Sequence, residues 1–140
     1  MKIFNLNIEG YWRLKNKKGI PTQPGVFFVY ECSYNIDLAT VTLIRIIYVG
    51  ESTNVNRFID TSESVELWLA FISEGHELCF STAYLNDLMS RELVMAGYIK
   101  NLQPHFNKGF EIPFPYESYQ VIASGKTSLL DTDFLVAGTL

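Results

Sequence analysis

Two long runs of apolar, β-forming residues stand out in the first half of the chain. The first, GVFFVYECSY, begins at Gly25, and the second, VTLIRIIYVG, ends at Gly50. Residues 35–40 separate them, an arrangement that predicts an antiparallel hairpin with a loose loop. Because both runs are apolar at nearly every position, we expect strands that are covered on both faces. A third strand is predicted over residues 77–83.

Helices are predicted in the segments that follow the hairpin. Residues 52–59 predict a short helix, and the apolar spacing in residues 65–72 predicts a second one. A longer helix begins after Asn86 or Asp87 and ends near residue 102, before Pro104. The predicted fold is therefore α+β, with a small, mainly antiparallel three-stranded sheet flanked by helices.

The regions on either side of this core have a different character. Residues 1–24 are predicted to form an extended N-terminal arm with a basic cluster. Residues 25–107 would form the folded domain, and residues 108–140 a C-terminal extension that packs on the same domain. The basic cluster of the arm consists of Arg13, Lys15, Lys17 and Lys18.

The composition excludes several classes of protein. The 140 residues include 11 Lys and Arg against 15 Asp and Glu, a formal net charge of −4, which argues against a generally basic nucleic-acid-binding domain. Aromatic residues make up 14% and charged residues 19%, which excludes a disordered chain. The separated Cys32 and Cys79 indicate neither a disulfide framework nor a zinc site. Without a signal-peptide pattern or an apolar run of membrane length, we expect a cytoplasmic protein with no membrane contact.

Three short motifs, in order along the chain, resemble the GIY-YIG nuclease family. The first is Gly25-Val26-Phe27, and the second is Tyr48-Val49-Gly50, followed by Glu51-Ser52-Thr53-Asn54-Val55. The third is the stretch from Tyr98 to Asn107, whose end, Pro104-His105-Phe106-Asn107, is similar to the family's closing Pro-x-x-Asn. The resemblance covers residues 25–107 and implies the family's α+β fold.

The resemblance also implies a chemistry. Members of the family cleave a phosphodiester with one divalent metal, usually Mg²⁺, which a glutamate holds, while tyrosine hydroxyls and an arginine assist. Carried over to this chain, the second-motif tyrosine is Tyr48, the closing asparagine is Asn107, and the nearest arginine is Arg57, displaced by one residue. The first-motif tyrosine is replaced by Phe27, which has no hydroxyl. Tyr48 is either a vestigial catalytic residue or a sheet tyrosine, and Arg57 either a phosphate contact or a solvated helix residue.

The metal ligand is the decisive position. Counting back from the closing motif, the family's glutamate falls on Met95, whose thioether does not replace a carboxylate for Mg²⁺. Glu92 lies one helical turn earlier and would be the metal ligand of a shifted site. Between Asp60 and Glu92 there are seven acidic residues and one basic residue, Arg91, a balance that opposes a polyanionic substrate.

Three functional hypotheses follow. The first is a GIY-YIG-like binding module for nucleic acid or protein, which has lost most of the nuclease centre and needs no cofactor. The alternative is an active DNA endonuclease with a rearranged site that uses Mg²⁺ or Mn²⁺. The third is a protein-interaction protein or an oligomeric structural protein, which would assemble as a homo-oligomer. If the first hypothesis involves nucleic acid, the basic cluster of residues 13–18 is the predicted contact.

Overall fold

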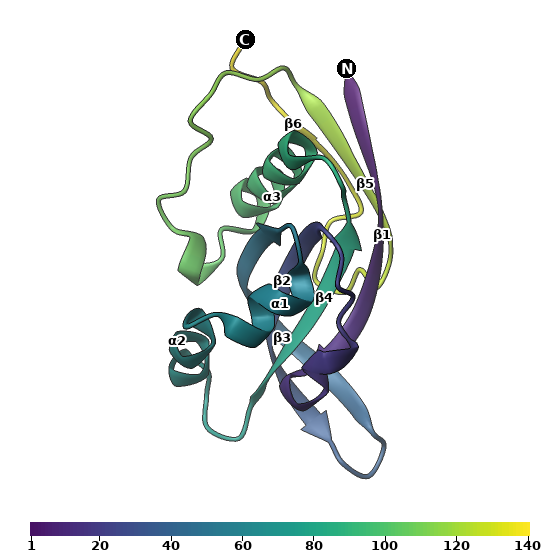
Figure 1. The fold of residues 1–140 in the computed structure, drawn as a ribbon, viewed down its shortest axis with the longest axis vertical. Helices are drawn as coiled ribbons and strands as arrows, with labels where there is room; N and C mark the ends of the chain where they lie inside the picture. Colours follow the sequence, from purple (N-terminus) through teal and green to yellow (C-terminus); the bar gives the residue numbers. More distant parts are fainter.

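A computed structural model describes all 140 residues, and it contains one six-stranded sheet beside three α-helices and two 3₁₀ helices (Figure 1). The strand order is β3-β2-β4-β1-β5-β6, antiparallel throughout except for the parallel pair β1 and β5. The strands are β1 (Lys2–Arg13), β2 (Gly25–Asn35), β3 (Thr40–Ser52), β4 (Glu77–Tyr84), β5 (Tyr119–Gly125) and β6 (Asp133–Val136). The helices are η1 (Leu14–Gly19), α1 (Val55–Thr61), α2 (Ser64–Phe71), α3 (Leu88–Leu102) and η2 (His105–Asn107).

The α+β class is confirmed, but the expected three-stranded sheet is wrong. The predicted strands are β2, β3 and β4, and the flanking regions add three more. Residues 2–13 do not form a free arm, because β1 lies inside the sheet between β4 and β5. In β1 every second side chain from Phe4 to Ile8 is buried, which is the periodicity of a strand with one covered face.

Two of the helices, α1 and α3, begin where a short polar side chain satisfies one of the first backbone N–H groups. Asn54 caps α1 by accepting a hydrogen bond from the N–H of Arg57, so this helix begins at residue 55 rather than 52. Asp87, one of the two capping residues that the sequence predicted, caps α3 by accepting from the N–H of Ser90 at 2.9 Å. No helix is both long enough and apolar enough to cross a membrane.

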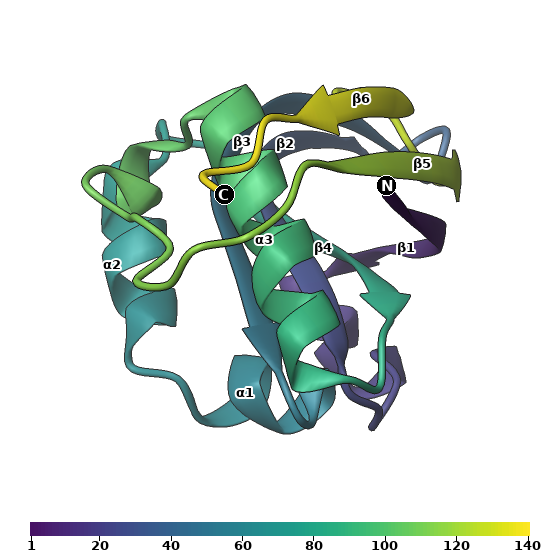
Figure 2. The same ribbon diagram turned by 90° about the horizontal axis from the view of Figure 1, so that it is seen from above.

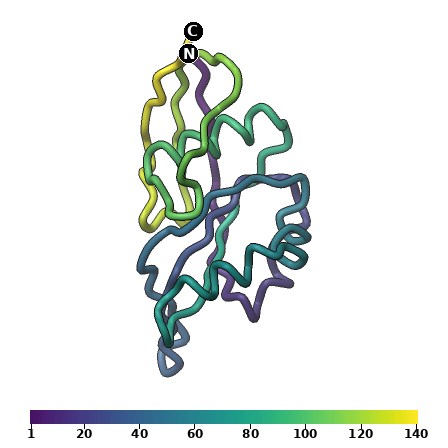
Figure 3. Tube along the Cα trace, turned by 90° about the vertical axis from the view of Figure 1, so that its left-hand side faces the viewer, coloured from purple at the N-terminus to yellow at the C-terminus, as the bar shows by residue number.

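Side chains that alternate along β2 build two cores on opposite faces of the sheet. Val26 and Phe28 belong to the core that α3 covers, and Phe27 and Val29 to the core that α1 and α2 cover. All four side chains are fully buried, which explains why this part of the run is apolar at consecutive positions. The β2–β3 hairpin extends away from these cores, at the end of the molecule opposite both termini (Figures 1 and 3).

Candidate functional site

The two glycine-bearing motifs lie side by side on paired strands. Phe27 on β2 is opposite Gly50 on β3, and Gly25 is opposite Ser52. Both glycines are sites of close approach, where a side chain would collide with its neighbours. A Cβ atom on Gly25 would lie 2.4 Å from the carbonyl oxygen of Ala83, and one on Gly50 would lie 2.5 Å from Cζ of Phe27. Packing alone therefore requires glycine at both positions.

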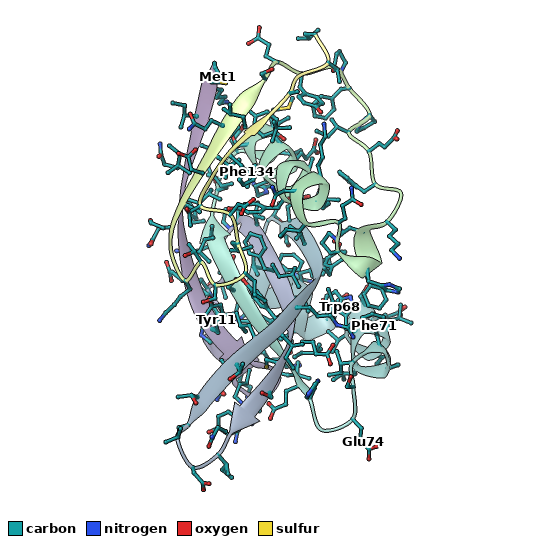
Figure 4. The ribbon with its side chains drawn as sticks, turned by 180° about the vertical axis from the view of Figure 1, so that it is seen from behind. Met1, Tyr11, Trp68, Phe71, Glu74 and Phe134 are labelled. Atoms are coloured by element: carbon teal, nitrogen blue, oxygen red, sulfur yellow. The ribbon has the colours of Figure 1, made fainter.

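Phe27 and Tyr48 belong to an aromatic cluster rather than to a polar site. The ring centroid of Phe27 is 5.0 Å from that of Phe58 and 5.9 Å from that of Tyr48. Tyr48 also packs on Trp68 at 5.3 Å, and Figure 4 shows Trp68 on the neighbouring helix α2. Burial, and then the nearby carboxylate of Glu51, raises the pKa of Tyr48. This direction keeps the hydroxyl protonated and opposes its use as a base.

Asn107 is brought to the edge strand β3, where its side chain bonds the backbone. Its Oδ1 accepts from the N–H of Val49 at 2.8 Å, and its Nδ2 donates to the carbonyl of the same residue at 3.0 Å. The side chain is buried, and it satisfies a strand edge that no other strand pairs. Both functional atoms of Asn107 are thus engaged in holding the chain together.

The other predicted site residues are not gathered around one point. Arg57 is exposed on α1, and its guanidinium makes no hydrogen bond or ion pair with the protein. Met95 and Glu92 lie on α3 and line a cavity of about 220 Å³ together with Glu51 at the end of β3. Hydrophobic residues that follow η2 form the rest of its wall: Phe110, Ile112, Pro113 and Phe114.

The side chains in this cavity do not fit a Mg²⁺ ion. Oε2 of Glu51 accepts a hydrogen bond from Nε of the buried Arg91 at 2.8 Å, so this carboxylate is already neutralised. Glu92 remains as one carboxylate, and the position one helical turn further along α3 carries the thioether of Met95, a poor ligand for a hard cation. No group of three or more His, Cys, Asp or Glu side chains is placed to hold a metal ion.

The basic cluster of residues 13–18 is divided by ion pairs. Arg13 donates two hydrogen bonds to Glu77, at 2.8 and 2.9 Å, and its guanidinium lies 3.5 Å from the ring centre of Tyr34. Lys17 pairs with Asp60 at 3.2 Å, which leaves Lys15 and Lys18 exposed and unpaired. The predicted nucleic-acid contact is therefore not a continuous positive surface.

Two features escaped the sequence analysis. The first is a buried carboxylate, Glu31 on β2, which accepts hydrogen bonds from Arg45 at 2.6 Å, from His76 at 2.5 Å and from the N–H of Ser73 at 2.9 Å. Burial alone would raise the pKa of Glu31, but these hydrogen bonds outweigh it and lower the pKa to about 2. Its signal in the sequence was one acidic residue within an otherwise apolar strand.

The second feature is a pair of thiols, Cys32 on β2 and Cys79 on β4. Both side chains are fully buried, and their sulfur atoms lie 2.6 Å apart as free cysteines. They are 47 residues apart along the chain, so only the register of β2 against β4 reveals that they are neighbours.

The chain matches no protein-family model, no curated protein and no solved structure. The candidate functions therefore depend on the residues themselves and on their arrangement.

Proposed function

We propose that the protein is a non-catalytic binding module on a GIY-YIG-like scaffold. The environment of Met95 carries this proposal. The position expected for the metal-holding glutamate contains a thioether within a largely apolar cavity, and the adjacent Glu51 is bound by Arg91. Two further members of the expected centre, Tyr48 and Asn107, are engaged in packing and in backbone hydrogen bonds.

The distribution of charge favours a protein partner over a nucleic acid. Two free lysines, Lys15 and Lys18, remain in the basic cluster, and contacts from two cations give only weak, salt-sensitive binding to DNA or RNA. On α2, in contrast, Leu67 and Leu69 are 62% and 42% exposed, and each follows an exposed carboxylate by about one helical turn, Glu63 and Glu66 respectively. Exposed leucines among carboxylates suit a protein segment with apolar and basic side chains.

A cleavage assay tests the loss of catalysis. We expect no cleavage of plasmid or single-stranded DNA by the wild-type protein in the presence of Mg²⁺ or Mn²⁺. The same assay is run on Glu92→Ala, with Glu117→Ala as a matched control in an exposed segment. Cleavage that disappears in Glu92→Ala and persists in Glu117→Ala would overturn the proposal in favour of the rearranged endonuclease.

A second experiment tests the class of partner. We expect fluorescence anisotropy to detect no salt-dependent binding to labelled DNA or RNA. Binding that is lost in Lys15→Gln/Lys18→Gln but kept in Lys126→Gln would instead identify a nucleic-acid partner. For the protein partner, a photo-crosslinking amino acid in place of Leu67 should give a cross-linked product that Glu63→Lys/Glu66→Lys abolishes. A product that is unchanged by this charge reversal would argue against the α2 surface.

A further inference from the structure

A second, larger cavity of about 470 Å³ lies beside α3. One wall is formed by α3, β5 and β6, and the other by residues 108–116, which we call the strap. Figure 2 shows the chain after α3 running past this helix before it enters β5. A volume of this size lies within the range of small-molecule sites, which is roughly 300–1,000 Å³.

The inner wall of the cavity is apolar and aromatic. Ile99 on α3, Tyr119 on β5 and Val136 on β6 are all buried and all line it. The hydroxyl of Tyr119 donates to the carbonyl of Leu93 at 2.6 Å, so its polar end is already satisfied. From the strap, Phe110 lines the cavity and is still 39% exposed, which leaves a ring available to cover a planar ligand.

The lining of the cavity carries more positive than negative charge. Lys100 in the last turn of α3 and Lys108 after η2 both line it, and neither forms an ion pair with a carboxylate. Glu111 on the strap is the one acidic residue of the lining. The balance of one positive charge favours an anionic group at the polar side of the cavity.

The strap is attached at its ends rather than along its length. At one end the N–H of Phe110 donates to the carbonyl of Asn107, and at the other Tyr116 exchanges hydrogen bonds with Thr139. Residues 111–115 between these points make no backbone hydrogen bond, and two of them are prolines. The strap is held there by packing of Ile112 and Phe114 on the core, so a ligand enters without breaking a hydrogen-bonded ladder.

We propose that this cavity binds a small organic anion with a planar apolar body. The carboxylate or phosphate of the ligand lies near Lys100 and Lys108, and its apolar body lies between Phe110 and the inner wall. This inference goes beyond the binding-module proposal and does not depend on it, because the cavity includes neither the α2 surface nor the basic cluster.

Titration calorimetry with three naphthalene derivatives tests the inference. We expect 1-naphthyl phosphate and 1-naphthoate to bind wild-type protein, and the neutral 1-naphthalenemethanol to bind about ten-fold more weakly, as the loss of one charge-assisted contact predicts. Binding of one anion but not the other would identify the anionic group that the site prefers. Inorganic phosphate alone should bind more weakly than the naphthyl anions, because it lacks the apolar body.

Surface substitutions that leave the core intact provide the controls. In Lys100→Gln/Lys108→Gln the affinity for both anions should fall to that of the neutral alcohol, whereas Lys15→Gln/Lys126→Gln, with the same change in net charge, should bind as wild type. Phe110→Ala should weaken binding of all three naphthyl compounds. The inference is overturned if the naphthyl anions do not bind, or if the two double variants bind them equally.

Discussion

Substitution of Glu31 by glutamine tests the energetics of the buried carboxylate directly. Its side chain is 1% exposed, and its two carboxylate oxygens contact Arg45 and His76. The negative charge is therefore stabilised by protein groups rather than by water. The pKa is lowered from 4.5 to about 2, and at about 1.4 kcal/mol per pKa unit this corresponds to about 3 kcal/mol of stability at neutral pH. Glu31→Gln should therefore lower the free energy of unfolding by about 3 kcal/mol at pH 7.

The pH dependence has a definite sign. Since the pKa is lower in the folded state, the contribution is complete above the unfolded-state pKa of about 4.5 and is lost as the pH falls towards 2. About 2 kcal/mol of it should be gone by pH 3. The difference between wild type and Glu31→Gln should shrink accordingly over this interval, because the variant has no carboxylate at this position to protonate.

Urea unfolding at pH 7, 4.5 and 3, followed by circular dichroism, measures this difference. Glu74→Gln is the matched control, because Glu74 is exposed in the turn before His76, on the loop between α2 and β4 (Figure 4). Its loss should change stability by less than about 0.5 kcal/mol. A gap between wild type and Glu31→Gln that is the same at pH 7 and pH 3 would refute the electrostatic reasoning and leave only a packing effect.

Two further substitutions examine residues of the motifs. Asn107→Ala should lower the free energy of unfolding by about 2 kcal/mol or more, because it removes two buried hydrogen bonds to Val49. Hydrogen exchange at the Val49 amide should accelerate in this variant but not in the control Asn101→Ala, where the substituted residue is exposed. Unchanged exchange at Val49 in Asn107→Ala would contradict the role of Asn107 in closing the strand edge. Gly50→Ala should cost about 1–3 kcal/mol in thermal or urea unfolding, because the added methyl group meets the buried ring of Phe27. In a Phe27→Leu background the same change should cost less, and an equal cost in both backgrounds would show that this contact is not the reason for glycine.

The sequence predicted the middle of the fold well and its two ends poorly. β2, β3, β4 and α3 were found because β-forming runs rich in apolar residues and a capping aspartate determine them locally. The strand β1 was missed because polar Asn5 and Asn7 alternate with its buried side chains. This is the pattern of a strand that is buried on one face, and it was interpreted as an extended arm. The cluster around Glu31 could not be predicted at all, since its partners come from β3 and from the turn before β4 and meet only through the sheet register.

The motif residues separate into two physical classes, and this separation bears on function. Gly25, Gly50 and Asn107 are required by packing and by backbone hydrogen bonding, so a chain that keeps this fold needs them whether or not it cleaves anything. Phe27 and Met95 occupy positions that the resemblance assigns to a hydroxyl and a carboxylate, and neither side chain can supply the missing group. The residues that hold the fold are present, whereas the first-motif hydroxyl and the metal-binding carboxylate that the resemblance predicts are absent. This combination supports the proposal of a non-catalytic binding module.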